Sequence, residues 1–340
     1  MTLAAIAAAK AMMASNAFVT PIARVADRVW GPRGCCLTFH RAAPSVIWDR
    51  LPNRDFYVDV GFLDSLLGYL LAQGWDVVTV SEALRRARSG SDQRRYVNFS
   101  IDDCYRDAFE LIVPVFRRHN VPITLYVTTG IPDGTLPLWV AGLEDAVLHR
   151  DRVVVDGDVL ELTTLKQRRD AYARLASSWD GPDVDRHYAA FCASNGIDIG
   201  AMHWKHAISW DMLQALASDP LVEIGAHGVT HIRMSAMSPD AALDELEQSR
   251  RRLNERLGID VRHFAFPYGR SGDCGPRDFA LARQARFSSA ATTRKGLIRP
   301  GQDAFSLPRN TINGGHRNLA LMEMHLTGLS GIAARVVGRV

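Results

Sequence analysis

Short apolar runs alternate with helical patterns along most of this chain, and this alternation restricts the fold more than any other feature. Seven runs are bounded by turn residues and are typical of buried strands: 35–39, 76–80, 96–101, 123–127, 222–225, 263–266 and 288–291. The patterns between them predict helices over 61–73, 81–88, 108–119, 209–217, 239–257 and 275–284. Strands and helices that alternate in this way form parallel sheets with crossover helices. Because no Gly-x-Gly-x-x-Gly follows any run, the sequence favours an α/β barrel over a dinucleotide-binding sheet.

One interval, from about residue 136 to residue 206, departs from this rhythm. It contains a polar hairpin-like stretch at 153–160, followed by an Arg-rich helical segment. We expect it to be an insertion that shapes substrate specificity, since insertions after barrel strands border the substrate mouth. The predicted organisation is an N-terminal helical segment (1–34), a barrel domain with this insertion (35–318) and a C-terminal helix (319–340).

The charge of the chain argues against a nucleic-acid partner. Its 40 basic and 37 acidic side chains leave a net charge of +3, which is too small a surplus for binding a polyanion. The longest basic run, 250–252, lies among glutamates that include Glu245, a pattern typical of a solvent-exposed helix face. Five cysteines without a Cys-x-x-Cys pair predict no disulfide framework.

The apolar stretch at 1–22 bears on location. Lys10 interrupts it and no basic segment precedes it, so it predicts a helix rather than a signal peptide or a membrane span. We therefore expect a cytoplasmic protein. A peripheral membrane or exported location stays open, as does contact between this helix and a membrane.

Two carboxylates, Asp102 and Asp103, directly follow the predicted strand 96–101. They should emerge at its C-terminal end, where barrel enzymes hold their active sites. An isolated Asp-Asp pair more often caps the helix that follows it, here 108–119. A second feature is needed before the pair can be assigned to chemistry.

Two histidine pairs could supply that feature. His227 and His231 follow the strand 222–225; imidazoles four residues apart project to one side of a helical turn and are common ligands of divalent transition metals. His203 and His206 form a rival pair inside the insertion. No carboxylate lies near this second pair in the sequence, so we expect both of its histidines at the surface.

A third element is the strand that ends in a Pro-Tyr-Gly turn at 267–269, which presents a backbone N–H at the same rim. Together the three elements offer one carboxylate and two imidazoles for a metal, a second carboxylate as a base and a backbone donor for an oxyanion. Metal-assisted hydrolysis of an amide requires this combination.

The three elements, in this order, resemble the motifs of the polysaccharide deacetylases with a NodB-homology domain, carbohydrate esterase family 4. The family's Thr-Phe-Asp-Asp-Gly motif is similar to 99–104, its His-Ser/Thr-x-x-His motif to 227–231, and its Arg-x-Pro-Tyr-Gly motif to 265–269. The segment 38–41 is similar to the Tyr-His element of exopolysaccharide deacetylases, a subgroup with a Phe-Ala-Tyr-Pro-Tyr-Gly motif. The resemblance extends from about residue 35 to residue 309.

The resemblance implies a distorted (β/α)7 barrel and a divalent metal ion, with Zn²⁺ favoured. The implied metal ligands are Asp103, His227 and His231. By the same resemblance, Asp102 is the general base, Tyr268 donates its backbone N–H to the oxyanion, and Thr230 supports the metal-binding loop.

The sequence departs from the family motifs at two positions. Cys104 stands where the family has Gly, and we expect it to pack rather than to ligate a metal. Ala265 stands where many members have an Arg that pairs with the base. We expect Arg309, in the segment 306–309 that closes the barrel, to replace this arginine.

The general acid is a third departure. The family's C-terminal Leu-x-His motif, whose histidine protonates the leaving amine, has no clear match here. His325 falls in a helical stretch and His316 in a turn, whereas His40 follows the strand 35–39. We therefore expect His40 near the site, either as the acid or as a structural imidazole.

The favoured function is the removal of acetyl groups from N-acetylated amino sugars, such as N-acetyl-hexosamine, in a glycan or oligosaccharide, by water that the metal activates. Two alternatives stay open. The same site could hydrolyse another non-peptide amide or a formyl group, because the insertion and not the motifs sets specificity. The chain could also be a glycan-binding pseudoenzyme, a hypothesis that the unmatched general acid favours and the intact aspartates and histidines disfavour.

Overall fold

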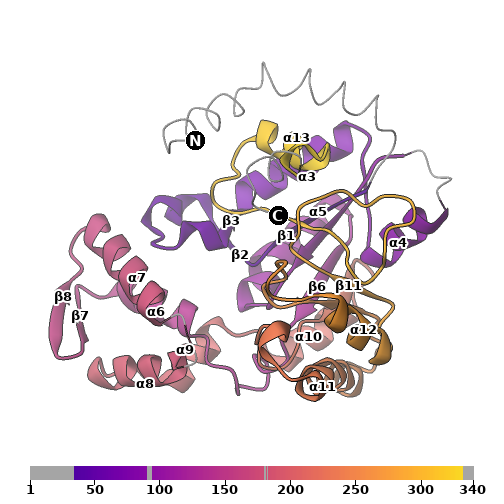
Figure 1. Ribbon diagram of the computed structural model, residues 1–340. Coiled ribbons are helices and arrows are strands. Elements are labelled where there is room, and N and C mark those ends of the chain that lie inside the picture. The colour runs from indigo at the N-terminus through magenta and orange to yellow at the C-terminus, as the bar shows by residue number, and fades with distance from the viewer. Residues whose placement is uncertain (1–33, 90–93, 180, 182, 332–340) are drawn as a thin grey trace, which may run out of the picture.

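The computed structural model describes residues 34–89, 94–179, 181 and 183–331, and Figure 1 shows their arrangement. The N-terminal segment predicted over 1–34 lies outside these ranges except for Gly34, which begins a strand. The C-terminal helix predicted over 319–340 is described as far as residue 331, and α13 spans Leu319–Leu326. Within the described ranges, no helix combines the length and apolar character needed to cross a bilayer.

A parallel sheet forms the centre of the molecule. Its strand order is β11-β10-β9-β6-β5-β1-β12, and β4 pairs with the start of β5 beside this path. The strands are β1 (Gly34–Phe39), β4 (Asp76–Val77), β5 (Tyr96–Ile101), β6 (Ile123–Val127), β9 (Val222–Ala226), β10 (His263–Ala265), β11 (Ser289–Ala291) and β12 (Asn310–Thr311). All seven predicted strands are present. The sheet curls because Leu307 pairs with Ala291 at one edge while Asn310 pairs with Leu37 at the other, which gives a distorted (β/α) barrel.

Helices connect the strands and cover the outside of the barrel (Figure 1). They are α3 (Val60–Ala72), α4 (Val80–Ser89), a π-helical turn (Ala108–Ile112) that leads into α5 (Val113–His119), α10 (Trp210–Ala217), α11 (Pro239–Leu257) and α12 (Pro276–Gln284). Each predicted helix lies within about two residues of its observed bounds. A short parallel pair, β2 (Arg41–Ala43) with β3 (Tyr57–Asp59), and three 3-10 turns (Ser45–Arg50, Arg54–Phe56 and Met234–Ala236) complete the barrel.

The predicted strand 76–80 is shorter than expected, and ends at Val77. Helix α4 begins at Val80 because two side chains satisfy its first backbone donors. Glu223 Oε2 accepts from the Val80 N–H at 2.8 Å, and Thr79 Oγ1 accepts from the Glu82 N–H at 3.1 Å.

Residues 139–206 form a separate lobe beside the barrel (Figure 1). Its elements are α6 (Trp139–His149), β7 (Arg152–Val155), β8 (Asp158–Glu161), α7 (Leu165–Trp179), α8 (Val184–Ser194) and α9 (Ile199–His206). The predicted hairpin is antiparallel and turns at Asp156 and Gly157, both with positive φ, as two-residue hairpin loops require. The lobe has its own buried apolar cluster, around residues such as Leu143, Trp179 and Phe191.

Buried charges join this lobe to the barrel. Arg41 Nε donates to Asp107 Oδ2 at 2.8 Å, and Arg41 Nη1 lies 3.7 Å from Glu144 Oε2 on α6. The Tyr57 hydroxyl also donates to Glu144. Because a buried charge is costly without its partner, these contacts oppose separation of the lobe from the strands that carry the site.

Alternate residues of the central strands face opposite ways. Leu37, Phe99 and Leu125 belong to the main apolar core beneath the helices. Thr38 and Ser100, one position along, hydrogen-bond to Arg309 inside the barrel. The interior of the barrel is therefore partly polar, and it leads to the ends of β1, β5 and β9.

Candidate active site

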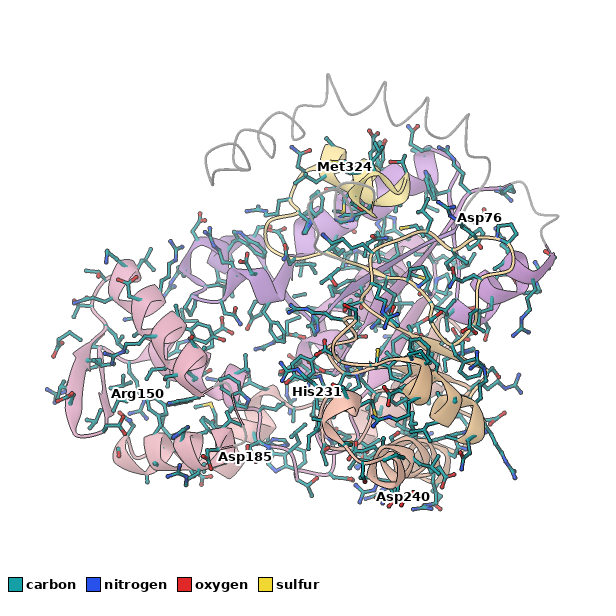
Figure 2. The ribbon with its side chains drawn as sticks, in the orientation of Figure 1. Asp76, Arg150, Asp185, His231, Asp240 and Met324 are labelled. Atoms are coloured by element: carbon teal, nitrogen blue, oxygen red, sulfur yellow. The ribbon has the colours of Figure 1, made fainter. Side chains whose placement is uncertain are left out.

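Asp103, His227 and His231 come together where β5 and β9 end. Asp103 Oδ1 lies 3.1 Å from His231 Nε2 and 3.5 Å from His227 Nε2. All three ligand atoms lie within 4.8 Å of one another, and this is the one such group found in the described part of the chain. Figure 2 shows His231 near the centre of the view, next to the side of the barrel that carries the lobe.

The group fits a divalent metal ion. Two ligands that share a tetrahedral zinc ion at 2.0–2.2 Å stand about 3.4 Å apart, close to the observed separations. Asp103 Oδ1 is buried and accepts no hydrogen bond of good geometry, so an acceptor that faces two imidazoles lacks a donor. His227 Nδ1 donates to the Ala265 carbonyl at 2.7 Å, and this leaves the Nε2 lone pair directed at Asp103.

The protonation states of the three groups differ. Burial lowers the pKa of His227 to about 4, so its ring is neutral at pH 7. Burial acts to raise the pKa of Asp103, but the neighbouring His231, His40 and His227 outweigh it and hold the pKa below its ordinary value. Burial acts to lower the pKa of His231, but the adjacent Asp103 outweighs it and raises the pKa, so a metal ion would displace a proton from this ring. The site therefore presents an ionised carboxylate between the neutral imidazole of His227 and the more basic imidazole of His231.

The backbone is strained around this group. Asp103, Cys104, His231 and Tyr268 all have positive φ, between 58° and 67°. Non-glycine residues adopt this conformation at an energetic cost, and such positions concentrate at functional sites. Asp103, His231 and Tyr268 follow three different strands, β5, β9 and β10, and their side chains lie together.

Cys104 occupies the position at which the family motif has glycine. Its φ of +67° is the reason that glycine suits this position. Its thiol is buried, and its Sγ lies 3.7 Å from the Tyr126 carbonyl. Burial, Asp103 and Asp102 raise the pKa of the thiol well above its ordinary value, so the thiol stays protonated.

Asp102 is buried and paired with Arg309. Arg309 Nη1 donates to Asp102 Oδ1 at 2.6 Å, and Nη2 donates to Oδ2 at 2.8 Å. The other Arg309 contacts are Thr38 Oγ1 and Ser100 Oγ, each at 3.1 Å, and the Thr292 carbonyl at 3.0 Å. Burial acts to raise the pKa of Asp102, but the Arg309 charge prevails and lowers it, so the carboxylate is ionised at neutral pH. Arg309 thus lies where the sequence analysis expects it.

His40 lies beside this pair, directly after β1. Its ring stacks on Phe56, with centroids 4.8 Å apart. Phe39 pairs with Ile101, and the Asp102 N–H donates to the Phe39 carbonyl at 3.0 Å, so His40 and Asp102 follow neighbouring strands at the same edge of the sheet.

Tyr268 borders the group on the other side. Its ring centroid is 5.0 Å from that of His231, and the Arg233 guanidinium lies 4.0 Å from it. Thr293 Oγ1 donates to the Tyr268 carbonyl at 2.6 Å and fixes the turn that carries its backbone N–H.

Glu245 is a supporting residue that the sequence analysis missed. From α11, its Oε2 accepts from the N–H groups of Val229 and Thr230 at 2.7 and 3.1 Å, and its Oε1 accepts from Thr230 Oγ1 at 2.8 Å. On the opposite side of the loop, the Gly130 N–H donates to the Val229 carbonyl at 3.0 Å. Glu247, Arg251 and Glu255 on α11 are exposed, as a solvated helix face predicts, whereas Glu245 is half-buried because α11 packs beside β9 and turns this side chain toward the histidine loop.

The expectation that His203 and His206 lie at the surface is wrong. His203 is 6% exposed, and its Nε2 donates to the Ile131 carbonyl at 2.9 Å. His206 Nε2 lies 3.1 Å from Asp145 Oδ2, a carboxylate on α6 that is distant in sequence. Packing of α9 against α6 buries His203 and leaves His206 half-buried, and both imidazoles have partners within the protein.

The two C-terminal histidines lie away from the site. The Cys35 thiol, near the start of β1, donates to the His325 carbonyl at 3.6 Å, whereas the site lies beyond the end of that strand. His325 Nδ1 lies 2.9 Å from Ser330 Oγ, and the rings of His316 and His325 are 5.0 Å apart. The structure therefore places neither ring with the aspartates, in agreement with the sequence analysis.

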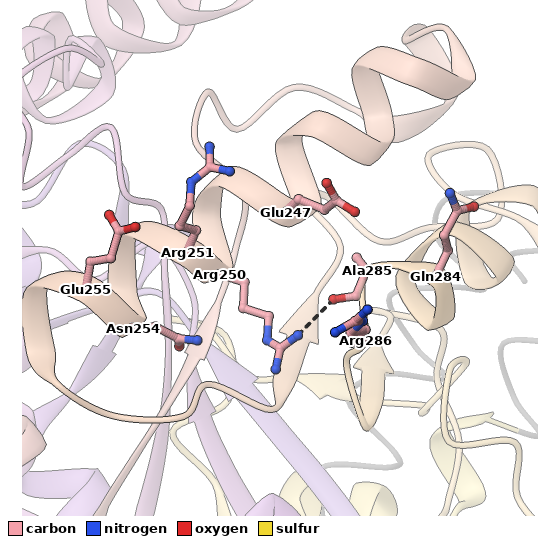
Figure 3. A pocket seen from close by; sticks show the side chains of 8 residues that line it. All are labelled: Glu247, Arg250, Arg251, Asn254, Glu255, Gln284, Ala285 and Arg286. Atoms are coloured by element: carbon pink, nitrogen blue, oxygen red, sulfur yellow. Dashed lines mark hydrogen bonds between the residues drawn. The ribbon is translucent and has the colours of Figure 1, made fainter.

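A separate cavity of about 450 Å³ lies between α11 and the end of α12 (Figure 3). Its lining is mainly charged: Glu247, Arg250, Arg251, Asn254, Glu255, Gln284, Ala285 and Arg286. None of the predicted site residues lines it, and Arg250 donates to the Ala285 carbonyl at 3.1 Å across its floor. The cavity is thus not part of the metal group.

Comparison with known families assigns the class of the protein. A profile of the polysaccharide deacetylase family matches residues 89–274, more than half of the chain. The chain belongs to this family, whose NodB-type members are hydrolases of carbon–nitrogen bonds other than peptide bonds. The matched segment holds Asp102, the three predicted ligands and Tyr268, and excludes His40 and Arg309. Among curated proteins, no match to the chain is found.

Solved structures agree with this fold. The deacetylase PplD of Streptococcus pyogenes, in complex with acetate, is 15% identical with a TM-score of 0.57; the alignment covers 86% of this chain and 98% of PplD. IcaB from Ammonifex degensii is 18% identical with a TM-score of 0.54, over 86% of this chain and 97% of IcaB. A de-N-acetylase from Aggregatibacter actinomycetemcomitans is 13% identical with a TM-score of 0.55, over 85% and 98%. At these identities the likeness shows the shared barrel.

Proposed function

We propose that this protein is a metal-dependent N-deacetylase that removes acetyl groups from N-acetylated amino sugars of a glycan or oligosaccharide. The observation that carries the proposal is the convergence of Asp103, His227 and His231 beside the ion pair of Asp102 and Arg309. Membership of the polysaccharide deacetylase family supports the reaction class and the carbohydrate substrate. A cytoplasmic location stays a prediction.

Asp103, His227 and His231 would hold the metal ion, and Zn²⁺ is favoured because two imidazoles and one carboxylate leave a position open for substrate. A divalent ion bound there supplies Lewis-acid polarisation of the amide carbonyl and makes water more acidic. The Ala265 carbonyl fixes the His227 tautomer, and Glu245 holds the loop between the two histidines.

Asp102 is the proposed general base. Its carboxylate is ionised, buried and oriented by two parallel hydrogen bonds from Arg309, so it can accept the proton of an attacking water without first losing one itself. Arg309 acts as a positioning residue, because it touches the base rather than the substrate.

Tyr268 and His40 take the remaining roles in this proposal. The backbone N–H of Tyr268, beside His231, would donate to the oxyanion that forms at the acetyl carbon. His40, near both aspartates, would protonate the leaving amine of the sugar.

The test uses the purified full chain with a panel of N-acetyl-hexosamine oligomers. Acetate release and metal content are measured for the wild type, Asp102→Asn and His231→Ala. We expect both variants to lose acetate release, with metal retained in Asp102→Asn and lost in His231→Ala. Acetate release that survives both changes would overturn the mechanism. Bound metal without turnover on any acetylated sugar would favour another amide or formyl substrate, or a glycan-binding pseudoenzyme.

A further inference from the structure

Trp204, on α9 of the lobe, leaves 45% of its surface exposed, although tryptophan is highly buried on average. A flat apolar surface that large at the edge of a lobe has a cost in water unless something covers it. Figure 1 shows α9 where the lobe meets the barrel.

The ring is held firmly. Its neighbour His203 packs edge-on against it, with centroids 4.8 Å apart and planes at 85°. Arg106 Nη2 donates to the backbone carbonyl of Trp204 at 2.8 Å and so fixes the main chain that carries the ring. The backbone of Gly134 lies against the Trp204 ring, so that a Cβ at this position would be 3.1 Å from the ring. The φ of Gly134 is +71°. A ring fixed in this way loses little side-chain entropy when a ligand packs on it.

Two chain segments link Trp204 to the metal group. Arg106 is the third residue after Asp103, a span of at most about 11 Å. Gly130, which hydrogen-bonds to the histidine loop, is four residues before Gly134, a span of at most about 14 Å. The Arg106 side chain and residues 229–231 lengthen these paths, which place the ring within about 30 Å of the metal group. An oligomer of several units with one unit at the metal group can therefore reach the ring.

We infer that Trp204 forms a glycan subsite, on which a sugar ring stacks while an N-acetyl group of another unit lies at the metal group. The C–H face of a pyranose is apolar with slightly positive hydrogens, and it complements the negative face of an indole ring. This inference rests on the proposed function, since it takes its ligand from the glycan substrate, and it assigns the preference for chain length to the lobe.

The test measures binding rather than turnover. N-acetyl-hexosamine oligomers of one to six units are titrated into the purified full chain by calorimetry, for the wild type, Trp204→Ala and Trp204→Phe. The control is Leu165→Ala, since Leu165 is on α7 of the same lobe and is also 45% exposed.

We expect affinity in the wild type to rise with oligomer length. In Trp204→Ala it should fall about threefold to tenfold for the longer oligomers, the size expected for one aromatic contact. Trp204→Phe should restore most of this loss, and Leu165→Ala should match the wild type.

Two results would overturn the inference: equal affinities of Trp204→Ala and the wild type for the long oligomers, or no binding of oligomers by the wild type. Sedimentation supplies a third, because loss of a dimer in Trp204→Ala with unchanged oligomer affinity would assign the ring to contact with a second copy. Acetate release is recorded in parallel. If binding depends on Trp204 but no acetate is released, the subsite is supported and the proposed deacetylase activity is contradicted. If acetate is released but Trp204→Ala leaves oligomer binding unchanged, the deacetylase is supported and the subsite is contradicted.

Discussion

Arg309 and Asp102 form a two-point ion pair inside the barrel, with N–O distances of 2.6 and 2.8 Å across a sequence separation of 207 residues. The resemblance to the family motifs implies an arginine next to the Pro-Tyr-Gly turn, where this chain has Ala265. In this chain the guanidinium that holds Asp102 comes from the segment that closes the barrel.

Replacing Arg309 by Ala should impair both stability and activity. A buried carboxylate would lose its partner, at a cost of about 3–5 kcal/mol in the free energy of unfolding. Loss of the positive charge raises the pKa of Asp102, so the acid limb of the pH–rate profile should move to higher pH. Steady-state rates of acetate release across pH, beside urea denaturation, measure both effects. Arg309→Lys keeps the charge and should retain more of each. A rate for Arg309→Ala within twofold of the wild type would remove Arg309 from the account.

Replacing Glu245 by Ala should weaken metal binding, because the loop between the two histidines loses three hydrogen bonds. Supporting contacts of this kind are worth about 10- to 100-fold in metal affinity. Competition with a zinc chelator measures the affinity directly. Glu247→Ala, two residues along the same helix, serves as the control, and equal affinities in the two variants would show that Glu245 does not hold the loop.

Cys104 offers a test of the backbone strain at the site. Its φ of +67° favours glycine, so Cys104→Gly should be more stable than Cys104→Ala by about 1–2 kcal/mol. Both variants remove the buried thiol, and only alanine keeps the Cβ that is disfavoured in this conformation. Chemical denaturation gives the two free energies of unfolding; an alanine variant as stable as the glycine variant would show that the conformation carries no such cost.

His325 should make the protein sensitive to acid. Burial first, and then the nearby His316 and Lys295, lower its pKa from 6.5 to about 3. Because the folded state binds this proton less readily than the unfolded state, the contribution of His325 is complete above pH 6.5 and is lost as the pH falls toward 3. The free energy of unfolding should decline by up to about 1.4 kcal/mol per pH unit from this group. His325→Gln, which cannot titrate, should show a shallower decline between pH 6 and pH 4, and equal slopes would contradict the assignment.

The sequence predicts the barrel well because residues within or next to each strand and helix indicate where that element begins and ends. The apolar run 96–101 is bounded by turns and followed by two carboxylates, and β5 has those bounds. The helix 239–257 starts after Ser238, which caps it, and ends before Gly258 with φ of +66°, and α11 has these bounds too. Such signals lie within a few residues of the feature they predict.

The predictions that fail concern side chains whose burial or hydrogen-bond partners depend on an element distant in the sequence. His203 is buried and His206 half-buried because α9 packs on α6, and the Asp145 partner is 61 residues away from His206. Glu245 contacts Thr230, 15 residues earlier and across a turn of the chain. Arg309 differs from these residues: the segment 306–309 closes the barrel, and this topology brings its guanidinium to Asp102 although the two are 207 residues apart.

Anomalous diffraction at the zinc absorption edge, from crystals of the full chain grown with Zn²⁺, tests the central claim most directly. The account predicts one peak at about 2.0–2.2 Å from Asp103 Oδ1 and from the Nε2 atoms of His227 and His231. No peak among these three side chains, or a peak at His203 and His206 instead, would contradict it.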